Sequence, residues 1–201
     1  MNLVAVADAI SWSALTLFLA AAATLSVLAF LRPRQVYVWF ATGSLAVALL
    51  AAASISEPSE RTGFGPLVTI LAFVAAVFGG SPAAATALNL AMGGTVSLGL
   101  HGGIVVTERP TPAEQRQGVT TGARREVLRG GLTIGVLERI ATAGTIIAGF
   151  PEGLAIVVAV KGVGRFTELE APEARERFII GTFASLIWAC AAALVVHLAL
   201  R

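Results

Sequence analysis

The sequence predicts an all-α integral membrane protein, a single domain over residues 1–201 in which six helices cross the bilayer. Two observations predict this class. Of the 201 residues, 56% are hydrophobic and 13% are charged, whereas about 25% are charged in a soluble domain. Apolar runs also recur at close to the roughly 20 residues that a helix needs to cross a bilayer. This composition excludes a soluble globular enzyme, a disordered protein and a nucleic-acid-binding module, and it makes the lipid bilayer the first expected partner.

Three spans are predicted in the N-terminal half, over residues 10–31, 36–55 and 64–78. A basic turn over residues 32–35 separates the first two. The run Gly79-Gly80-Ser81-Pro82 is expected to break the third span, because proline cannot donate a backbone hydrogen bond and favours the start of a helix. Residues 83–92 would then form a short apolar helix that lies in the interface, re-enters the bilayer or becomes a seventh span.

Residues 93–130 are predicted to leave the bilayer as a cytoplasmic hairpin and an Arg-rich loop. Two β-rich runs, 95–100 and 104–109, flank His101-Gly102-Gly103, a pattern typical of a hairpin. The polar stretch 110–125 that follows is predicted to be a flexible loop. The connection carries five arginines, which are Arg109, Arg116, Arg124, Arg125 and Arg129.

Three further spans are predicted over residues 131–149, 154–166 and 178–200, and we interpret the charged connection 167–177 as a solvated interfacial helix. Basic residues of membrane proteins concentrate in cytoplasmic loops. Placing the turn 32–35 inside puts ten basic residues inside and only Arg61 and Arg201 outside. This predicts a multi-pass protein of the bacterial cytoplasmic (inner) membrane with both termini outside. A seven-span arrangement would place the Arg-rich loop outside and fits the rule less well.

Three charged side chains fall inside predicted spans: Glu138 and Arg139 in the fourth and Lys161 in the fifth. A charge at mid-bilayer costs about 2.5 kcal/mol or more and usually has a partner or a role. At 1.5 Å per residue, Glu138 lies roughly 18 Å and Lys161 roughly 15 Å from the turn near Phe150. The two are level, so we predict an ion pair between them. Arg139 points about 100° away around the helix, which leaves the cluster with one net positive charge.

Three interpretations of this cluster remain open at this stage. The pair fixes the hairpin, the charges form a polar site for an anion, a proton or a lipid phosphate, or the charges lie in water at helix ends. Small residues such as Gly181 and Ser185 also recur along the later spans. Such spacing allows close helix packing in lipid and makes a homodimer through these faces a candidate arrangement.

Three blocks stand out in the C-terminal part of the chain, which are Leu137-Glu138-Arg139, Lys161-Gly162-Val163-Gly164-Arg165 and Glu176-Arg177-Phe178-Ile179-Ile180-Gly181-Thr182. They resemble the LER, KGxGR and ERFIIGT blocks of an uncharacterised family of small bacterial integral membrane proteins, found largely in high-GC Gram-positive bacteria. The resemblance brings no established activity. It implies that the charged residues of these blocks belong together, with Arg165, Glu176 and Arg177 as a cluster at the cytoplasmic edge beneath the buried one.

No motif in the sequence supports an enzyme. There is no Walker A, GxSxG or HExxH pattern, and the one cysteine and two histidines show no ligand spacing, so we expect no catalytic residue, cofactor or metal. The first functional hypothesis is a small transporter or channel with its polar site at Glu138, Arg139 and Lys161. The alternative is a non-catalytic membrane scaffold or partner subunit that docks through the Arg-rich loop, where anionic lipid headgroups would also bind.

Overall fold

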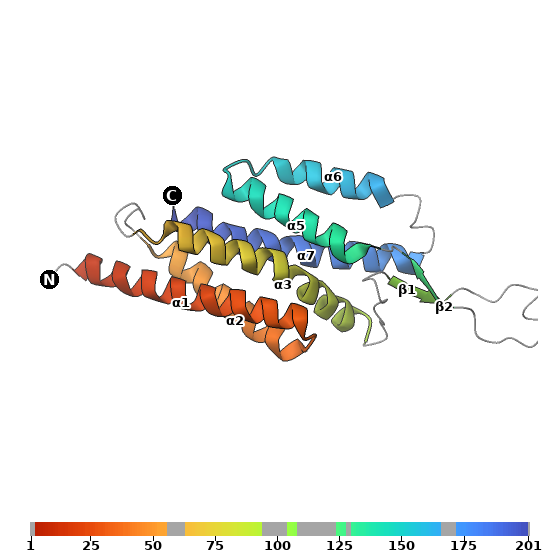
Figure 1. Ribbon diagram of the computed structural model, residues 1–201, viewed down its shortest axis with the longest axis horizontal. Coiled ribbons are helices and arrows are strands. Elements are labelled where there is room, and N and C mark those ends of the chain that lie inside the picture. The colour runs from red at the N-terminus through yellow and green to blue at the C-terminus, as the bar shows by residue number, and fades with distance from the viewer. Residues whose placement is uncertain are drawn as a thin grey trace, which may run out of the picture.

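The computed structural model describes residues 3–55, 63–93, 104–107, 124–127, 130–165 and 172–200, and these form a helix bundle with one pair of short strands (Figure 1). The elements in chain order are α1 (Leu3–Leu31), α2 (Gln35–Ala53), α3 (Gly65–Ala91), β1 (Ile104–Thr107), β2 (Arg124–Val127), α5 (Gly131–Ile147), α6 (Gly153–Arg165) and α7 (Pro172–Ala199). Four of the helices, α1, α2, α3 and α7, are long and apolar enough to cross a membrane. The helical membrane class that the composition predicts is therefore supported by the lengths of the helices.

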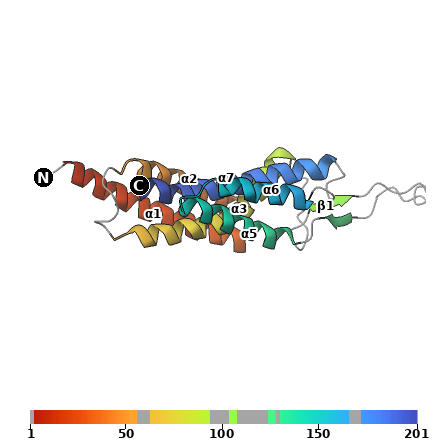
Figure 2. The ribbon, with the colours of Figure 1, turned by 90° about the horizontal axis from the view of Figure 1, so that it is seen from above.

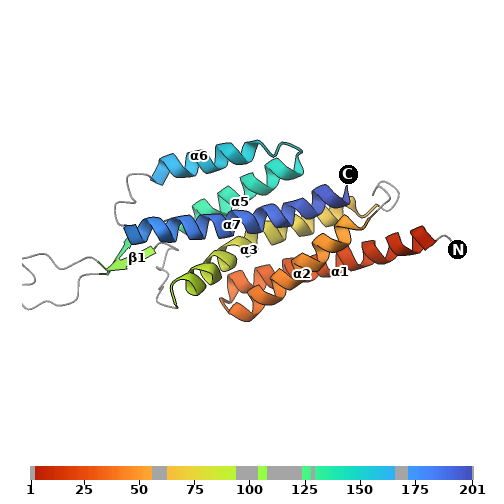
Figure 3. The ribbon, with the colours of Figure 1, turned by 180° about the vertical axis from the view of Figure 1, so that it is seen from behind.

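The helices α5 and α6 are shorter than a full span. Their 17 and 13 residues correspond to roughly 25 and 20 Å of helix at 1.5 Å per residue, against about 30 Å for the hydrocarbon core of a bilayer. They form an antiparallel hairpin, and α6 packs mainly on α5. Figures 1 and 3 show α6 on the outside of the bundle, and Figure 2 shows the same bundle from above.

The core is built from alanine on the long helices. Side chains of α1, α2, α3 and α7 that lose all exposure include Ala22, Ala48, Ala72, Ala75, Ala189, Ala192 and Ala193. Small residues let helix backbones approach closely, which is how helices pack where lipid offers no hydrophobic drive for association. The helix α7 packs against α3, α5 and α2, while α1 packs against α2 and α3. The start of α1 and the end of α7 lie at one end of the bundle, and the strands lie at the other (Figure 1).

The helix α3 runs unbroken through the segment where the sequence predicts a break. It contains Pro82 in its interior and continues to Ala91, so residues 83–92 form no separate short helix, and the expected break and the seventh span are both wrong. The physical reason is that Gly79 and Gly80 serve as points of close approach. A Cβ at Gly79 would overlap the indole of Trp188 from α7, and a Cβ at Gly80 would overlap the Arg139 side chain from α5.

Neighbouring side chains also hydrogen-bond backbone carbonyls just before Pro82. The indole Nε1 of Trp188 donates to the carbonyl of Ala75 at 2.9 Å, and Nε of Arg139 donates to the carbonyl of Val77 at 2.7 Å. The carbonyl that Pro82 leaves without a helical donor is that of Phe78, so these two bonds do not replace the lost one. They fasten α7 and α5 to α3 within the two turns before the proline.

We expect the substitution Gly79→Ala to lower the free energy of unfolding by about 2 kcal/mol, a typical cost of overpacking. The added methyl group would push Trp188 away and break its bond to the carbonyl of Ala75. Unfolding in detergent, followed by tryptophan fluorescence, measures the change. The matched control is Gly43→Ala on α2, where a Cβ would meet no heavy atom within 4 Å and alanine's higher helix propensity favours the variant. Equal stability of the two variants would contradict this packing.

The two strands pair antiparallel, with Ile104 opposite Val127 and Thr107 opposite Arg124. The sequence predicts a strand in the run that contains β1. It predicts a flexible loop over residues 110–125, and this prediction is wrong for residues 124 and 125, which lie in β2. The predicted partner run 95–100 lies outside the described residues, so that pairing stays a prediction. Most of the Arg-rich loop also lies outside them, and so docking through it stays a prediction.

A glycine turn ends α5 and sends the chain back as α6. Gly149 has φ +75°, a left-handed conformation that suits glycine. The amide of Phe150 donates to the carbonyl of Thr145 at 2.8 Å, and the amide of Gly149 donates to that of Ile146 at 3.1 Å. These two bonds are those of a Schellman motif, which satisfies the last carbonyls of a helix. The motif sets the direction of α6, which decides what faces α5.

Candidate functional site

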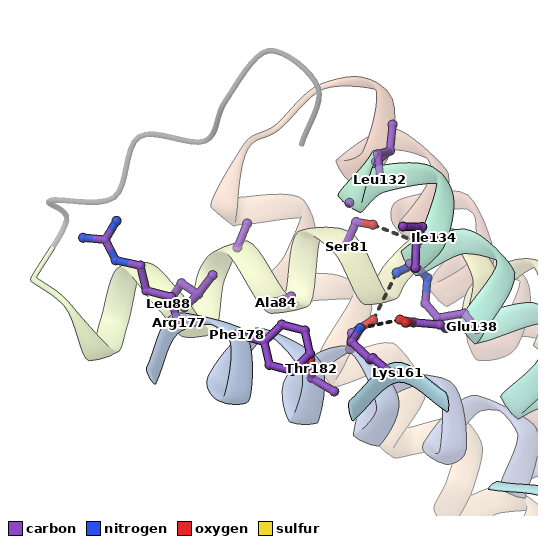
Figure 4. A pocket seen from close by; sticks show the side chains of 16 residues that line it. Ser81, Ala84, Leu88, Leu132, Ile134, Glu138, Lys161, Arg177, Phe178 and Thr182 are labelled. Carbon is purple, nitrogen blue, oxygen red and sulfur yellow. Dashed lines mark hydrogen bonds and ion pairs between the residues drawn. The ribbon is translucent and has the colours of Figure 1, made fainter. Parts of the chain in front are cut away.

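Glu138 on α5 and Lys161 on α6 form an ion pair across the hairpin, as their equal distance from the turn predicts. Both side chains are largely shielded, with 12% of Glu138 and 15% of Lys161 exposed. The ammonium group of Lys161 also lies 5.5 Å from the centre of the Phe178 ring on α7, within the range of a cation–π contact. Figure 4 shows the two charged groups pointing at each other, with Phe178 beside them. Lys161 therefore reaches from α6 to both neighbouring helices.

Arg139 lies on another face of α5 and is 2% exposed. Its Nε donates to the carbonyl of Val77, its Nη1 donates to Oγ of Ser185 at 3.0 Å, and its Nη2 donates to Oγ of Ser81 at 2.8 Å. These partners come from α3 and α7, so the guanidinium joins three helices. The sequence prediction that Arg139 faces a different neighbour from Glu138 is confirmed.

Two glycines make room for the Arg139 side chain. A Cβ at Gly80 on α3 would overlap the Cδ of Arg139, and one at Gly135, a turn earlier on α5, would come within 3.1 Å of Nη1. The guanidinium thus lies over backbone with no side chains in the way. This arrangement is built for arginine, because only its planar fork offers several donors in fixed directions.

The charge of Arg139 is not balanced by a carboxylate in contact. Among the described residues, no carboxylate lies within ion-pair distance of it, because the adjacent Glu138 binds Lys161. The three bonds go to neutral oxygens and use three of the five N–H groups of the guanidinium. One N–H on Nη1 and one on Nη2 remain. With two cations and one carboxylate, Glu138, Arg139 and Lys161 carry one net positive charge, and the two remaining N–H groups of Arg139 have no hydrogen-bond partner among the described residues.

A pocket of about 210 Å³ lies against these charges, between α3, α5 and α7. Glu138, Arg139 and Lys161 line it together with the hydroxyl groups of Ser81, Thr182 and Ser185. Arg177 lines it as well, and the rest of its wall is apolar or glycine: Ala84, Ala85, Leu88, Gly131, Leu132, Ile134, Gly135, Phe178 and Gly181. Figure 4 shows side chains from α3, α5, α6 and α7 around the same space. A few charged groups in a mostly apolar pocket are typical of a site that orients a ligand.

The cluster expected at the cytoplasmic edge comes together only in part. Arg177 is half-buried and lines the pocket, and Figure 4 shows it away from Lys161. Glu176 is exposed, and the side chain of Arg165 lies outside what the structure describes. The helix α7 begins at Pro172 and continues without a break to Ala199, so residues 172–177 are the first turns of this helix and form no separate interfacial helix. Residues 167–171 lie outside the described part of the chain.

The small residues Gly181 and Ser185 face into the bundle. A Cβ at Gly181 would lie 3.6 Å from Cδ1 of Leu88 on α3. The hydroxyl of Ser185 accepts a hydrogen bond from Arg139. This pair is therefore used within the chain, and a homodimer through other small-residue faces stays a prediction. Sequence reasoning missed Ser81, Ser185 and Phe178 as members of the site. A signal for Ser81 was present in the glycine run before it, which indicates a close approach as well as a break.

No protein-family model, curated protein or solved structure matches the chain. The resemblance to the family with LER, KGxGR and ERFIIGT blocks therefore stays a prediction. The proposed function is therefore argued from the geometry and charges of the site.

Proposed function

We propose that the protein is a small transporter of the bacterial cytoplasmic membrane and that its substrate is an anion that binds in the pocket between α3, α5 and α7. The observation that carries the proposal is the buried Arg139, which contacts no carboxylate among the described residues and lines the pocket with two N–H groups left over from its three bonds. A buried charge of this kind in a membrane protein usually has a partner or marks a pathway. An anionic substrate supplies the partner.

In this proposal six helices lie in the membrane, with α5 and α6 as a shorter hairpin beside the four long ones. Both termini are outside, and the turn 32–35, the strand pair and the start of α7 are on the cytoplasmic side. The positive-inside rule supports this orientation. The pocket then lies toward the cytoplasmic side of the bilayer, because it is lined by the first turns of α5 and α7.

The ion pair gives the site a way to respond to its substrate. A bound anion attracts the ammonium of Lys161 and competes with Glu138 for it. Because α6 packs mainly on α5, loosening this pair frees α6 to shift relative to α7. Binding and movement are then coupled through one side chain, and the difference in affinity between the two arrangements sets how far the equilibrium shifts.

The test is transport into liposomes that contain the full-length protein, with two anionic probes. Uptake of radiolabelled inorganic phosphate reports the first. Loss of dodecyl phosphate from the outer leaflet, measured by its accessibility to an external phosphatase, reports the second. We expect the protein to move at least one probe faster than empty liposomes do. We also expect Lys161→Gln to reduce that rate by about tenfold or more, the effect of losing about 1.4 kcal/mol of interaction.

Two further variants keep this test decisive. Ala84→Phe fills the pocket without changing a charge and should also abolish transport. Gly144→Ala on α5, where a Cβ meets no atom within 4 Å, should transport like the unchanged protein. Transport of neither probe, or an unchanged rate in folded Lys161→Gln and Ala84→Phe, would refute the proposal.

A further inference from the structure

A second cavity of about 430 Å³ lies along the groove between α5 and α6. Apart from the ion pair, its lining is apolar or glycine: Ile134, Leu137, Ala141, Ile156, Val157, Val160 and Gly164. It shares Ile134, Glu138 and Lys161 with the pocket between α3, α5 and α7. The ion pair therefore stands where a small charged pocket meets a longer apolar groove.

From this juxtaposition we infer that the ligand is a single-chain anionic amphiphile, with its headgroup in the charged pocket and its chain in the α5–α6 groove. The inference rests on the proposed function and names its substrate class. The volumes support it, because a pocket of about 210 Å³ is smaller than the about 300–1,000 Å³ of a typical small-molecule site and suits a headgroup alone. The groove falls within that range and carries no polar group besides the shared pair.

The headgroup end has the chemistry to bind an oxyanion. The two spare N–H groups of Arg139 can donate to two oxygens of one phosphate, which is the bidentate arrangement that arginine favours. The ammonium of Lys161 adds a third donor and a second positive charge. Glu138 balances one of the two positive charges, so Glu138, Arg139 and Lys161 together carry one net positive charge.

The groove end opens on the outer surface of the bundle. Leu137, Ile156 and Val160 line it and are strongly exposed. In a bilayer these side chains contact acyl chains, so an amphiphile reaches the site sideways from the lipid. A polar solute would instead need a water-filled route, and the polar side chains of α1 to α3 are mostly serine and threonine. An amphiphile that enters from the lipid needs no water-filled route.

The test is binding of three matched probes to the full-length protein, counted by native mass spectrometry from a neutral maltoside detergent. Dodecyl phosphate has both headgroup and chain, dodecanol has the chain alone, and inorganic phosphate has the headgroup alone. We expect a single bound dodecyl phosphate at concentrations where the other two probes leave the protein unoccupied. Affinity for dodecyl phosphate should exceed that for either part by about tenfold or more.

Matched variants locate the chain of the ligand. Ala141→Phe fills the α5–α6 groove at an exposed position, without touching a charge, and should weaken dodecyl phosphate binding by about tenfold. Ala159→Phe makes the same change at an exposed position of α6 that does not line either cavity, and it should bind like the unchanged protein. Both positions face away from the core, so both variants should fold.

The outcomes separate this inference from the proposed function. Equal binding of inorganic phosphate and dodecyl phosphate, or unchanged binding in Ala141→Phe, overturns the amphiphile and leaves an anion transporter in place. Tight binding of dodecyl phosphate without transport in liposomes supports the ligand class and overturns the transporter. Binding of dodecanol as tight as that of dodecyl phosphate overturns the role of the charged headgroup.

Discussion

Replacing Lys161 with methionine should lower the free energy of unfolding by about 3–4 kcal/mol. The variant keeps a long unbranched side chain, one atom shorter than lysine, but leaves the carboxylate of Glu138 shielded and without its cation. Removing one member of a buried ion pair costs about 3–5 kcal/mol, mostly because the remaining charge is stranded. The residual exposure of 12% and 15% places the expected cost in the lower part of that range. Unfolding of the purified protein in detergent, followed by tryptophan fluorescence, measures it.

The double variant Glu138→Gln with Lys161→Met tests whether the cost comes from the unpaired carboxylate. It removes both charges, and replacing a whole buried pair by neutral groups is close to neutral for stability. We therefore expect the double variant to come within about 1 kcal/mol of the unchanged protein. If Lys161→Met is as stable as the unchanged protein, the ion pair does not stabilise the hairpin. The same follows if adding Glu138→Gln restores none of the lost free energy of unfolding.

The second large effect is expected at Arg139, where lysine keeps the charge but not the geometry. The guanidinium donates to Val77, Ser81 and Ser185 from three nitrogens at once, and a single ammonium can keep about one of these bonds. A hydrogen bond to a charged group contributes about 1.5 kcal/mol or more, so losing two should cost about 3 kcal/mol of unfolding free energy. Denaturation in detergent measures this, and binding of dodecyl phosphate should fall as well.

The matched control is Arg34→Lys, the same change at an exposed residue before α2. It should alter the free energy of unfolding by less than about 0.5 kcal/mol, as is usual for surface substitutions. If Arg139→Lys is as stable as Arg34→Lys, the three hydrogen bonds contribute nothing to the free energy of unfolding. Arg139 would then not stabilise the packing of the three helices.

The sequence predicts the Glu138–Lys161 pair well because both residues lie on one hairpin. Their similar distance from the turn follows from the rise per residue of a helix and the position of that one turn, and both can be read from the local sequence. The partners of Arg139 are a different case, because Val77 and Ser81 lie about sixty positions earlier in the chain and Ser185 lies on α7. Which helices surround α5 is decided by packing of the whole bundle, and no pattern within one segment carries that information.

The break expected in α3 shows a second limit of the sequence. Glycine and proline lower the intrinsic preference for helix, and by that measure residues 79–82 are a sound place to end one. In the bundle, the missing Cβ atoms at Gly79 and Gly80 are instead what lets Trp188 and Arg139 reach the backbone. Tertiary contacts override local propensity here, and they do so beside the candidate site.

The dependence of α6 on α5 has a consequence for biogenesis. A helix of 13 residues is too short to cross a bilayer alone, and a lysine at its centre costs about 2.5–3.5 kcal/mol on insertion scales. We therefore expect the α5–α6 hairpin to leave the translocon as one unit, with Lys161 already paired with Glu138. The bonds of Arg139 are completed later, because one of its three acceptors is Ser185 on α7, which is synthesised after α5 and α6. Until α7 is in place, Arg139 lacks its bond to Ser185, so we expect the packing of α7 to complete the contacts of this arginine.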